Sequence, residues 1–133
     1  MGETLIILDT CTLLWLSDIS YSLPSSVKEA LRSCPPSERF VSAITAFEIG
    51  FKSALGKLNL PVPAKVWFEE TCAQRGIQSL PLTASVAMRA SQLPLHHRDP
   101  ADRFIISTAL EFQLKILTPD KIFSKYDAAV VWD

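Results

Sequence analysis

Short apolar segments alternate with helix-like segments along the whole sequence, and this alternation most constrains the fold. Residues 4–8 form a short, largely apolar run that stops at Asp9, which is typical of a strand covered on both faces. Similar runs follow at residues 39–42, 77–82, 115–118 and 128–132. Strands separated by helices predict an α/β domain, with a mostly parallel central sheet of four or five short strands and helices on both faces.

Helical spacing of apolar residues fills the intervals between these strands. A capped amphipathic helix is expected from Ser25 and ends before Pro35, and helical spacing returns at residues 45–55. Pro63 precedes another helical segment, and a last one follows Asp99. The sequence shows no charge block, low-complexity stretch or repeat that would divide it.

Composition bounds the size and the partners of the protein. A chain of 133 residues buries enough surface for one core but hardly for two, so we expect a single domain spanning residues 1–133. Its 13 Lys and Arg against 14 Asp and Glu exclude nucleic-acid binding through bulk positive charge, although local basic patches remain open. No apolar run approaches the roughly 20 residues that cross a bilayer, and no basic stretch precedes the first run, so we expect neither membrane association nor secretion.

Cysteine usage points to a reducing compartment. Cys11, Cys34 and Cys72 are odd in number and none lies within three residues of another. This pattern predicts neither a disulfide framework nor a zinc site of two CxxC pairs. Three reduced cysteines are typical of a cytoplasmic protein, and we expect this chain to act in the cytoplasm.

Acidic residues recur where predicted strands give way to helices. Because ligands of parallel sheets bind beyond the carboxyl ends of the strands, acids at these junctions are expected to share one edge of the sheet. Five acids qualify: Asp9, Glu48, Asp99, Asp102 and Asp120.

Helix capping is the alternative explanation for most of these acids. Glu48 closes a capping box that starts at Thr45, and Asp99 before Pro100 is a typical N-cap. Asp102 would then face the positive end of the helix dipole, and Asp120 could cap a short helix of its own. Asp9 is harder to explain in this way, because an acid directly after a buried strand is costly to keep there.

If the acids are neighbours in space, helix capping alone does not offset the electrostatic repulsion between them. Two carboxylates 4 Å apart repel by about 4 kcal/mol at an effective dielectric of 20, whereas a helix N-terminus returns about 0.3–1 kcal/mol. Protons or cations must therefore offset the repulsion. A hard divalent ion with oxygen ligands, Mg²⁺ or Mn²⁺, is the natural candidate, and its chemistry would be hydrolysis of phosphodiesters.

Basic residues near the acids suggest an anionic substrate. The candidate rim consists of Lys52, Lys57, Arg98, Arg103, Lys121 and Lys125. The adjacent His96 and His97 would point apart, so we do not expect both to bind one metal; contacts with backbone, solvent or phosphate are the favoured interpretation, and a general base is the alternative.

Four stretches in this order resemble the PIN-domain ribonucleases, and specifically the VapC toxins of VapBC toxin–antitoxin modules. They are ILDT at residues 7–10 with LLW at 13–15, SAITAFEI at 42–49 with LGKL at 55–58, HHRDPADR at 96–103, and LTPD at 117–120. Together they span almost the whole chain. Cys11 and Ala101 depart from the pattern, since many relatives have His and a bulky residue there.

The resemblance implies a three-layer α/β/α PIN-like domain with an acidic pocket for Mg²⁺ or Mn²⁺ and metal-dependent endonucleolytic cleavage of RNA. It implies metal ligation by Asp9, Asp102 and Asp120, with Glu48 as a further catalytic acid and Asp99 as an auxiliary one. The residues expected to contact substrate are Thr10, Thr118, Lys52, Arg98 and Arg103.

The resemblance also implies the toxin of a type II toxin–antitoxin system, with a cognate small antitoxin protein as partner and a homodimer as assembly. Exposed Trp15, Leu16, Phe51 or Leu55 would serve dimerisation, if they are not buried in the core. Two alternatives remain: a PIN-like module that only binds RNA or protein, and a haloacid-dehalogenase-like phosphatase. The phosphatase needs an acid where Cys11 stands.

Overall fold

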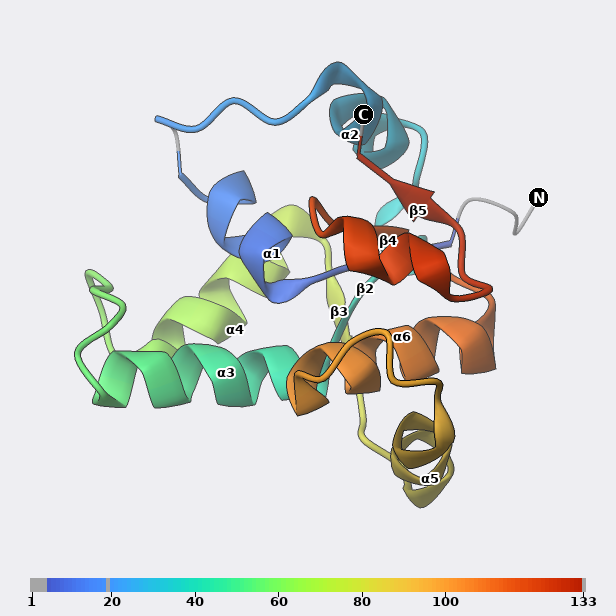
Figure 1. Ribbon diagram of the computed structural model, residues 1–133. Helices are drawn as coiled ribbons and strands as arrows, with labels where there is room; N and C mark the ends of the chain where they lie inside the picture. The colour runs from blue at the N-terminus through green and yellow to red at the C-terminus, as the bar shows by residue number, and fades with distance from the viewer. Residues whose placement is uncertain (1–4, 19, 133) are drawn as a thin grey trace.

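The computed structural model describes residues 5–18 and 20–132, and its centre is a five-stranded sheet in the order β3-β2-β1-β4-β5 (Figure 1). Every neighbouring pair of strands is parallel. The α/β prediction is therefore confirmed, although most strands are shorter than expected, and Thr4 lies outside the described residues. The strands are β1 (Ile6–Leu8), β2 (Arg39–Ser42), β3 (Gln78–Leu80), β4 (Lys115–Leu117) and β5 (Val130–Val131).

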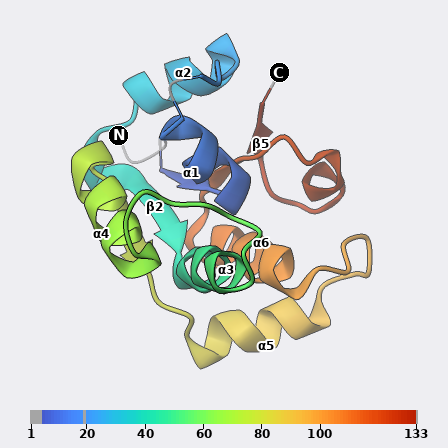
Figure 2. The same ribbon diagram turned by 90° about the vertical axis from the view of Figure 1, so that its left-hand side faces the viewer.

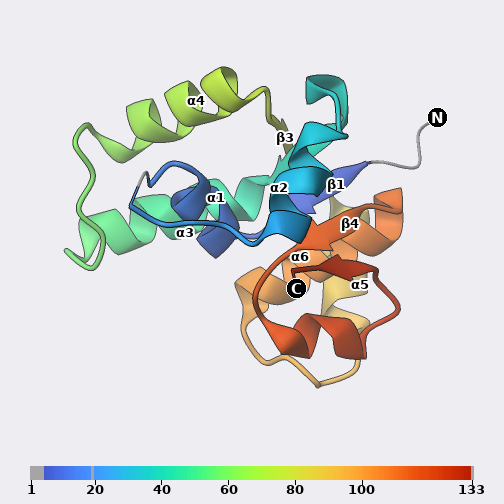
Figure 3. The same cartoon turned by 90° about the horizontal axis from the view of Figure 1, so that it is seen from above.

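Helices connect the strands and cover both faces of the sheet. Figures 1 and 2 show α2 on one side of the sheet and α6 on the other, with α5 beyond α6. The connection between α3 and α4 extends far from the sheet (Figure 3). The helices are α1 (Thr10–Leu16), α2 (Ser25–Arg32), α3 (Ala43–Ala54), α4 (Ala64–Arg75), α5 (Ala84–Gln92) and α6 (Pro100–Phe112), with 3-10 turns η2 (Pro36–Glu38) and η3 (Lys121–Lys125).

Capping residues and apolar spacing in the sequence predict some helix ends correctly and others wrongly. Asp99 caps α6 and Pro100 is its first residue, as predicted. The expected cap of α2 is wrong, because Pro24 occupies its N-cap position without a side-chain hydrogen bond. The expectations also omit α1 and α5, which are too short for their apolar spacing to stand out.

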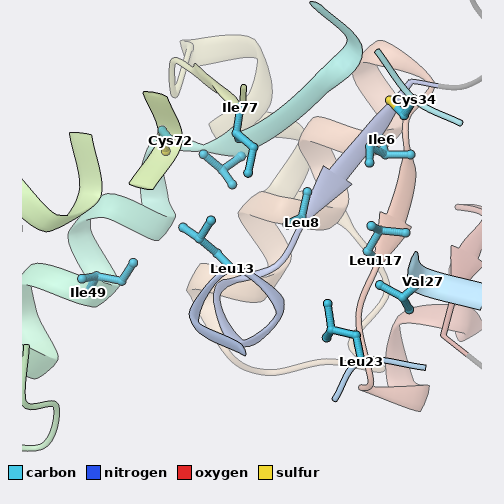
Figure 4. Packing of buried hydrophobic residues seen from close by; sticks show 11 residues of the cluster. Ile6, Leu8, Leu13, Leu23, Val27, Cys34, Ile49, Cys72, Ile77 and Leu117 are labelled. Atoms are coloured by element: carbon cyan, nitrogen blue, oxygen red, sulfur yellow. The ribbon is translucent and has the colours of Figure 1, made fainter. Parts of the chain in front are cut away.

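Alternation along β1 divides the interior into two cores. Ile6 and Leu8 face a cluster that includes Leu13 of α1 and Val27 of α2 (Figure 4). Ile7 points to the opposite face, where its cluster consists largely of α6, η3 and the start of α3. These strand residues are almost fully buried, and each such side chain contributes about 1.5–3 kcal/mol of hydrophobic stabilisation. The result is the three-layer arrangement that the sequence resemblance implies.

The order of the strands creates a junction between β1 and β4. From β1 the chain adds β2 and then β3 on one side, and it later returns to add β4 on the other side. Leu8 lies opposite Leu117, and the backbone N–H of Asp9 donates to the carbonyl of Leu117 at 3.2 Å. The residues that follow these two strands are therefore neighbours at the carboxyl edge, where parallel sheets bind their ligands.

The apolar residues considered for dimerisation divide into two groups. Phe51 and Leu55 are each 53% exposed, whereas Trp15 and Leu16 are partly buried against the first cluster. All three cysteines are free. In the part of the chain that the structure describes, no helix has both the length and the apolar character needed to span a membrane.

Arg103 fastens the loop between α5 and α6. The side chain is buried, and its guanidinium donates to four backbone carbonyls of that region: Ala90, Leu93, Pro94 and His97. Its donors are thus used inside the protein. The side chain also lines a cavity together with Arg98, and its expected contact with substrate stays a prediction.

We predict that Arg103→Lys lowers the free energy of unfolding by about 3 kcal/mol, measured by urea denaturation. A lysine ammonium cannot reproduce the planar fork of donors, and each buried carbonyl left without a partner costs about 1–3 kcal/mol. The matched control Arg98→Lys changes an exposed side chain and should be nearly neutral. Equal stability of the two variants would contradict this role of Arg103.

Candidate functional site

The five acids predicted from the sequence line one cavity of about 270 Å³. Figure 1 shows the N-terminal ends of α1 and α6 at the same edge of the sheet, the carboxyl edge of β1. Segments that lie far apart in the chain thus deliver their carboxylates to a common space. The lining consists of Asp9, Thr10, Cys11, Glu48, Lys52, Asp99, Asp102, Pro119 and Asp120.

Asp9 is the most deeply placed acid, at 4% exposure. It is the N-cap of α1, where Oδ1 accepts the backbone N–H of Thr12 at 2.9 Å and its hydroxyl at 2.6 Å. The hydroxyl of Thr118, from the end of β4, donates to Oδ2 at 2.6 Å. These three donors hold the carboxylate in one orientation without removing its negative charge.

Glu48 lies inside α3 and does not close a capping box. The helix begins at Ala43, and Ser42 caps it by accepting the N–H of Ile44 at 3.1 Å. The predicted capping box is therefore wrong, because the helix starts before Thr45. The hydroxyl of Thr10 donates to Oε1 of Glu48 and lies 3.1 Å from the hydroxyl of Thr45. This arrangement directs Glu48 toward the acids at the cavity.

The remaining acids occupy the start of α6 and the start of η3. Asp99 caps α6 by accepting the N–H of Ala101 at 2.9 Å, and Asp102 lies in the first turn. Asp120 caps η3 by accepting the N–H of Ile122 at 2.9 Å. Capping is thus confirmed for Asp99 and Asp120, and it places both acids at the cavity rather than away from it.

His97 is a site residue whose contact with the acids was not predicted. Its Nε2 lies 3.0 Å from Oδ2 of Asp102 and 2.9 Å from Oδ2 of Asp120. The side chain is buried, whereas that of His96 is exposed and contacts the ring of Tyr126 edge-on. The divergence of the two rings was predicted. Sequence spacing alone carried no signal that His97 would reach Asp120, which is 23 positions away.

Burial and mutual repulsion raise the pKa values of the central acids. Burial is the main cause for Asp9, and the hydrogen bonds from Thr118 and Thr12 oppose it. Burial and the charge of Asp99 raise the pKa of Asp102 to about 7, against the opposing effect of His97. The hydrogen-bond donors of the protein therefore do not fully stabilise the negative charges of these carboxylates.

The residues expected to contact substrate occupy different environments in the structure. Lys52, one turn beyond Glu48 on α3, lines the acidic cavity, whereas Arg98 lines a neighbouring, more apolar cavity. Thr118 is almost fully buried, with its hydroxyl donating to Asp9 and accepting the N–H of Asp120 at 3.1 Å. Its expected contact with substrate stays a prediction. Thr10 lines the cavity, but its hydroxyl holds Glu48.

The donor set suits a hard divalent cation. Carboxylate oxygens predominate around the cavity, and oxygen is the ligand atom that Mg²⁺ and Mn²⁺ favour. The raised pKa values of Asp9 and Asp102 indicate charge that a cation would neutralise. Sulfur is present only at Cys11 on the lining, and burial raises the pKa of that thiol, which keeps it in the weakly ligating protonated form.

We predict that, without divalent metal, the free energy of unfolding falls as the pH rises from about 4 to about 7. The pKa of Asp102 is raised from 3.8 to about 7, so the folded protein keeps a proton that the unfolded chain has lost in this range. Asp102→Asn should flatten the pH dependence measured by urea denaturation in a chelator. The matched control Asp127→Asn, at an exposed position, should not; an unchanged slope in Asp102→Asn would contradict the prediction.

Known proteins resemble this chain over most of its length. Ribonuclease VapC22 of Mycobacterium tuberculosis is 29% identical over 119 residues, which cover 89% of this chain and 88% of that protein. The crystal structure of FitAcB from Neisseria gonorrhoeae has a chain with a TM-score of 0.68 and 26% identity, covering 94% of this chain and 95% of that one. DNA-bound VapBC from Salmonella typhimurium gives a TM-score of 0.72 at 18% identity, with 95% and 96% coverage, and shares the fold.

The sequence profile of the PIN domain family matches residues 6–129. This range includes all five acids of the cavity. The resemblance inferred from the four sequence stretches is thereby confirmed, and the chain belongs to the PIN domain family.

Proposed function

We propose that this protein is a metal-dependent endoribonuclease that acts as the toxin of a type II toxin–antitoxin system. The observation that carries the proposal is the common cavity of Asp9, Glu48, Asp102 and Asp120, whose carboxylates come from separate parts of the chain. The similarity to a protein named as a ribonuclease supports the choice of RNA.

Asp9, Asp102 and Asp120 are the proposed ligands of Mg²⁺ or Mn²⁺. Each has carboxylate oxygens at the cavity, and such ions need only one or two direct carboxylates together with water. A bound divalent ion supplies polarisation of the scissile phosphate and a bound water of lowered pKa. Asp99 is exposed at the cavity margin and adds negative charge as an auxiliary acid.

Glu48 is the proposed general base. The hydroxyl of Thr10, which also contacts that of Thr45, donates to the carboxylate of Glu48 and restrains the side chain at the cavity. From this position Glu48 orients the attacking water and accepts its proton, while the ribose 3′ oxygen leaves. Thr118 contributes by fixing Asp9 and therefore acts on the reaction through that carboxylate.

Lys52 is the proposed contact for the RNA backbone. It is exposed, and it lines the cavity one helical turn from Glu48. Its ammonium places a positive charge at the cavity that can pair with a backbone phosphate, whereas the whole chain has a net charge of −1. Arg98 lies at the adjacent cavity and extends this basic margin.

A cognate antitoxin is the proposed protein partner. The similar solved structures include a toxin–antitoxin complex from Klebsiella pneumoniae and structures of FitAB and VapBC. A cytoplasmic location agrees with both the RNA substrate and the three free cysteines. The homodimer implied by the sequence resemblance stays a prediction, for which Phe51 and Leu55 supply exposed apolar surface.

We predict that Asp9→Asn lowers the rate of RNA cleavage by about 100-fold or more while the protein stays folded. Loss of one ligand charge removes several kcal/mol of transition-state stabilisation, and each 1.4 kcal/mol corresponds to about tenfold in rate. Cleavage is measured on a labelled RNA with Mg²⁺ or Mn²⁺, and a chelator should stop the wild-type reaction.

The control for this experiment is Asp127→Asn, which removes an exposed carboxylate that is absent from the lining of the acidic cavity. It should cut at the wild-type rate. Asp9→Asn cutting equally fast would overturn the proposed site. Wild-type protein that binds RNA but never cuts it would favour the binding module, and a trapped aspartyl-phosphate on Asp9 would favour the phosphatase.

We also predict that Lys52→Ala weakens RNA binding and reduces its salt dependence by about one phosphate contact. Binding is measured across a series of salt concentrations in the Asp9→Asn background, so that cleavage does not interfere. The matched control is Lys65→Ala on α4, where the ammonium pairs with Glu69 at 2.7 Å. Identical salt slopes for the two variants would exclude Lys52 from the RNA contact.

A further inference from the structure

His97 stands between two of the proposed metal ligands, and this position allows two roles. Ligand atoms of His97, Asp102 and Asp120 all lie within 4.8 Å of one another. Imidazole and carboxylate groups together bind transition metals, so His97 could be a further ligand. It could instead be a hydrogen-bond donor that arranges the two carboxylates. The two roles require different protonation of Nε2.

The hydrogen bond at the other ring nitrogen distinguishes these roles. The backbone N–H of Asp99 donates to Nδ1 of His97 at 3.2 Å. Nδ1 must therefore present its lone pair, and in the neutral ring the proton is on Nε2. A metal ligand would need the lone pair on Nε2, which would move the proton to Nδ1 and direct it at the N–H of Asp99. The geometry thus favours Nε2 as a donor to Asp120, with the carboxylate of Asp102 beside the same N–H.

The surrounding structure fixes the ring in this orientation. The hydroxyl of Tyr126 accepts the backbone N–H of His97 at 2.8 Å and donates to the carbonyl of Pro94 at 2.7 Å. Arg103 donates to the carbonyl of His97 at 3.0 Å. The ring of Phe123 contacts the imidazole edge-on, with centroids 5.4 Å apart. Figure 1 shows the loop between α5 and α6 close to the C-terminal segment that provides these aromatic residues.

We infer that His97 is a positioning residue that keeps Asp120 and Asp102 side by side and does not bind the metal itself: its Nε2–H donates to Oδ2 of Asp120 at 2.9 Å and lies beside Oδ2 of Asp102, 3.0 Å from Nε2. This inference rests on the proposed metal-dependent function. Two carboxylates that share a site repel each other, and a single donor within 3.0 Å of both keeps their oxygens near one point. The acids are then arranged for a cation before it arrives, which reduces the reorganisation that binding requires.

Mn²⁺ affinity of the full chain tests this role, measured by electron paramagnetic resonance titration without RNA. His97→Ala should weaken binding by about 10–100-fold, the usual effect of losing a group that supports metal ligands. His97→Gln should restore most of the affinity, because its amide N–H reaches the former position of Nε2. The matched control is His96→Gln, at the exposed neighbouring ring, and it should bind like the wild type. Thermal unfolding confirms that the variants compared are folded.

Pulsed resonance of Mn²⁺ bound to the wild-type protein tests ligation directly and needs no variant. We expect no coupling from a directly bound imidazole nitrogen; observing one would overturn the inference. Unchanged affinity in folded His97→Ala would also overturn it, while the proposed nuclease stands if the wild type binds Mn²⁺ and cuts RNA. A wild type that binds no Mn²⁺ would overturn both.

Discussion

The parallel pairing of β1 with β4 is the constraint on which the whole site depends. It joins Leu8 to Leu117 across most of the chain and sets Asp9 beside Thr118. The hydroxyl of Thr118 then reaches both Asp9 and the N–H of Asp120, so one buried side chain relates two acids from opposite ends of the sequence. The other acids arrive on α3 and α6, which pack against this pair of strands. The positions of the acidic side chains therefore follow from the order and pairing of the strands.

Gathering the acids in one cavity serves the proposed function but lowers the stability of the folded protein. Burial raises the pKa values of both Asp9 and Asp102, which means that the folded protein holds their charged forms unfavourably. Hydrogen bonds from Thr12 and Thr118 to Asp9, and the imidazole of His97 beside Asp102, offset part of that cost. Such an electrostatic cost is expected at a site that is arranged to receive a cation.

The sequence predicted the elements and the gathering of acids better than it predicted side-chain roles. The bounds of β2 and the cap of α6 at Asp99 follow from local signals, and the common edge follows from parallel strands. Local signals failed at Glu48, because the start of α3 depends on how Ser42 ends β2. The partners of Arg103 and His97 were missed, because they are set by tertiary packing around the α5–α6 loop. No spacing rule encodes which way a side chain turns within such a loop.

The late position of β4 in the chain has a consequence for biosynthesis. Residues 1–110 contain Asp9, Glu48 and Asp102, but not the strand and threonine that fix Asp9 from the other side. Contacts of this kind, between sequence-distant segments, form slowly and only when both segments are present. A nascent polypeptide that lacks β4 therefore carries most of the acids without an assembled centre. Synthesis of β4, rather than the appearance of any single acid, therefore sets the moment at which these acids can assemble.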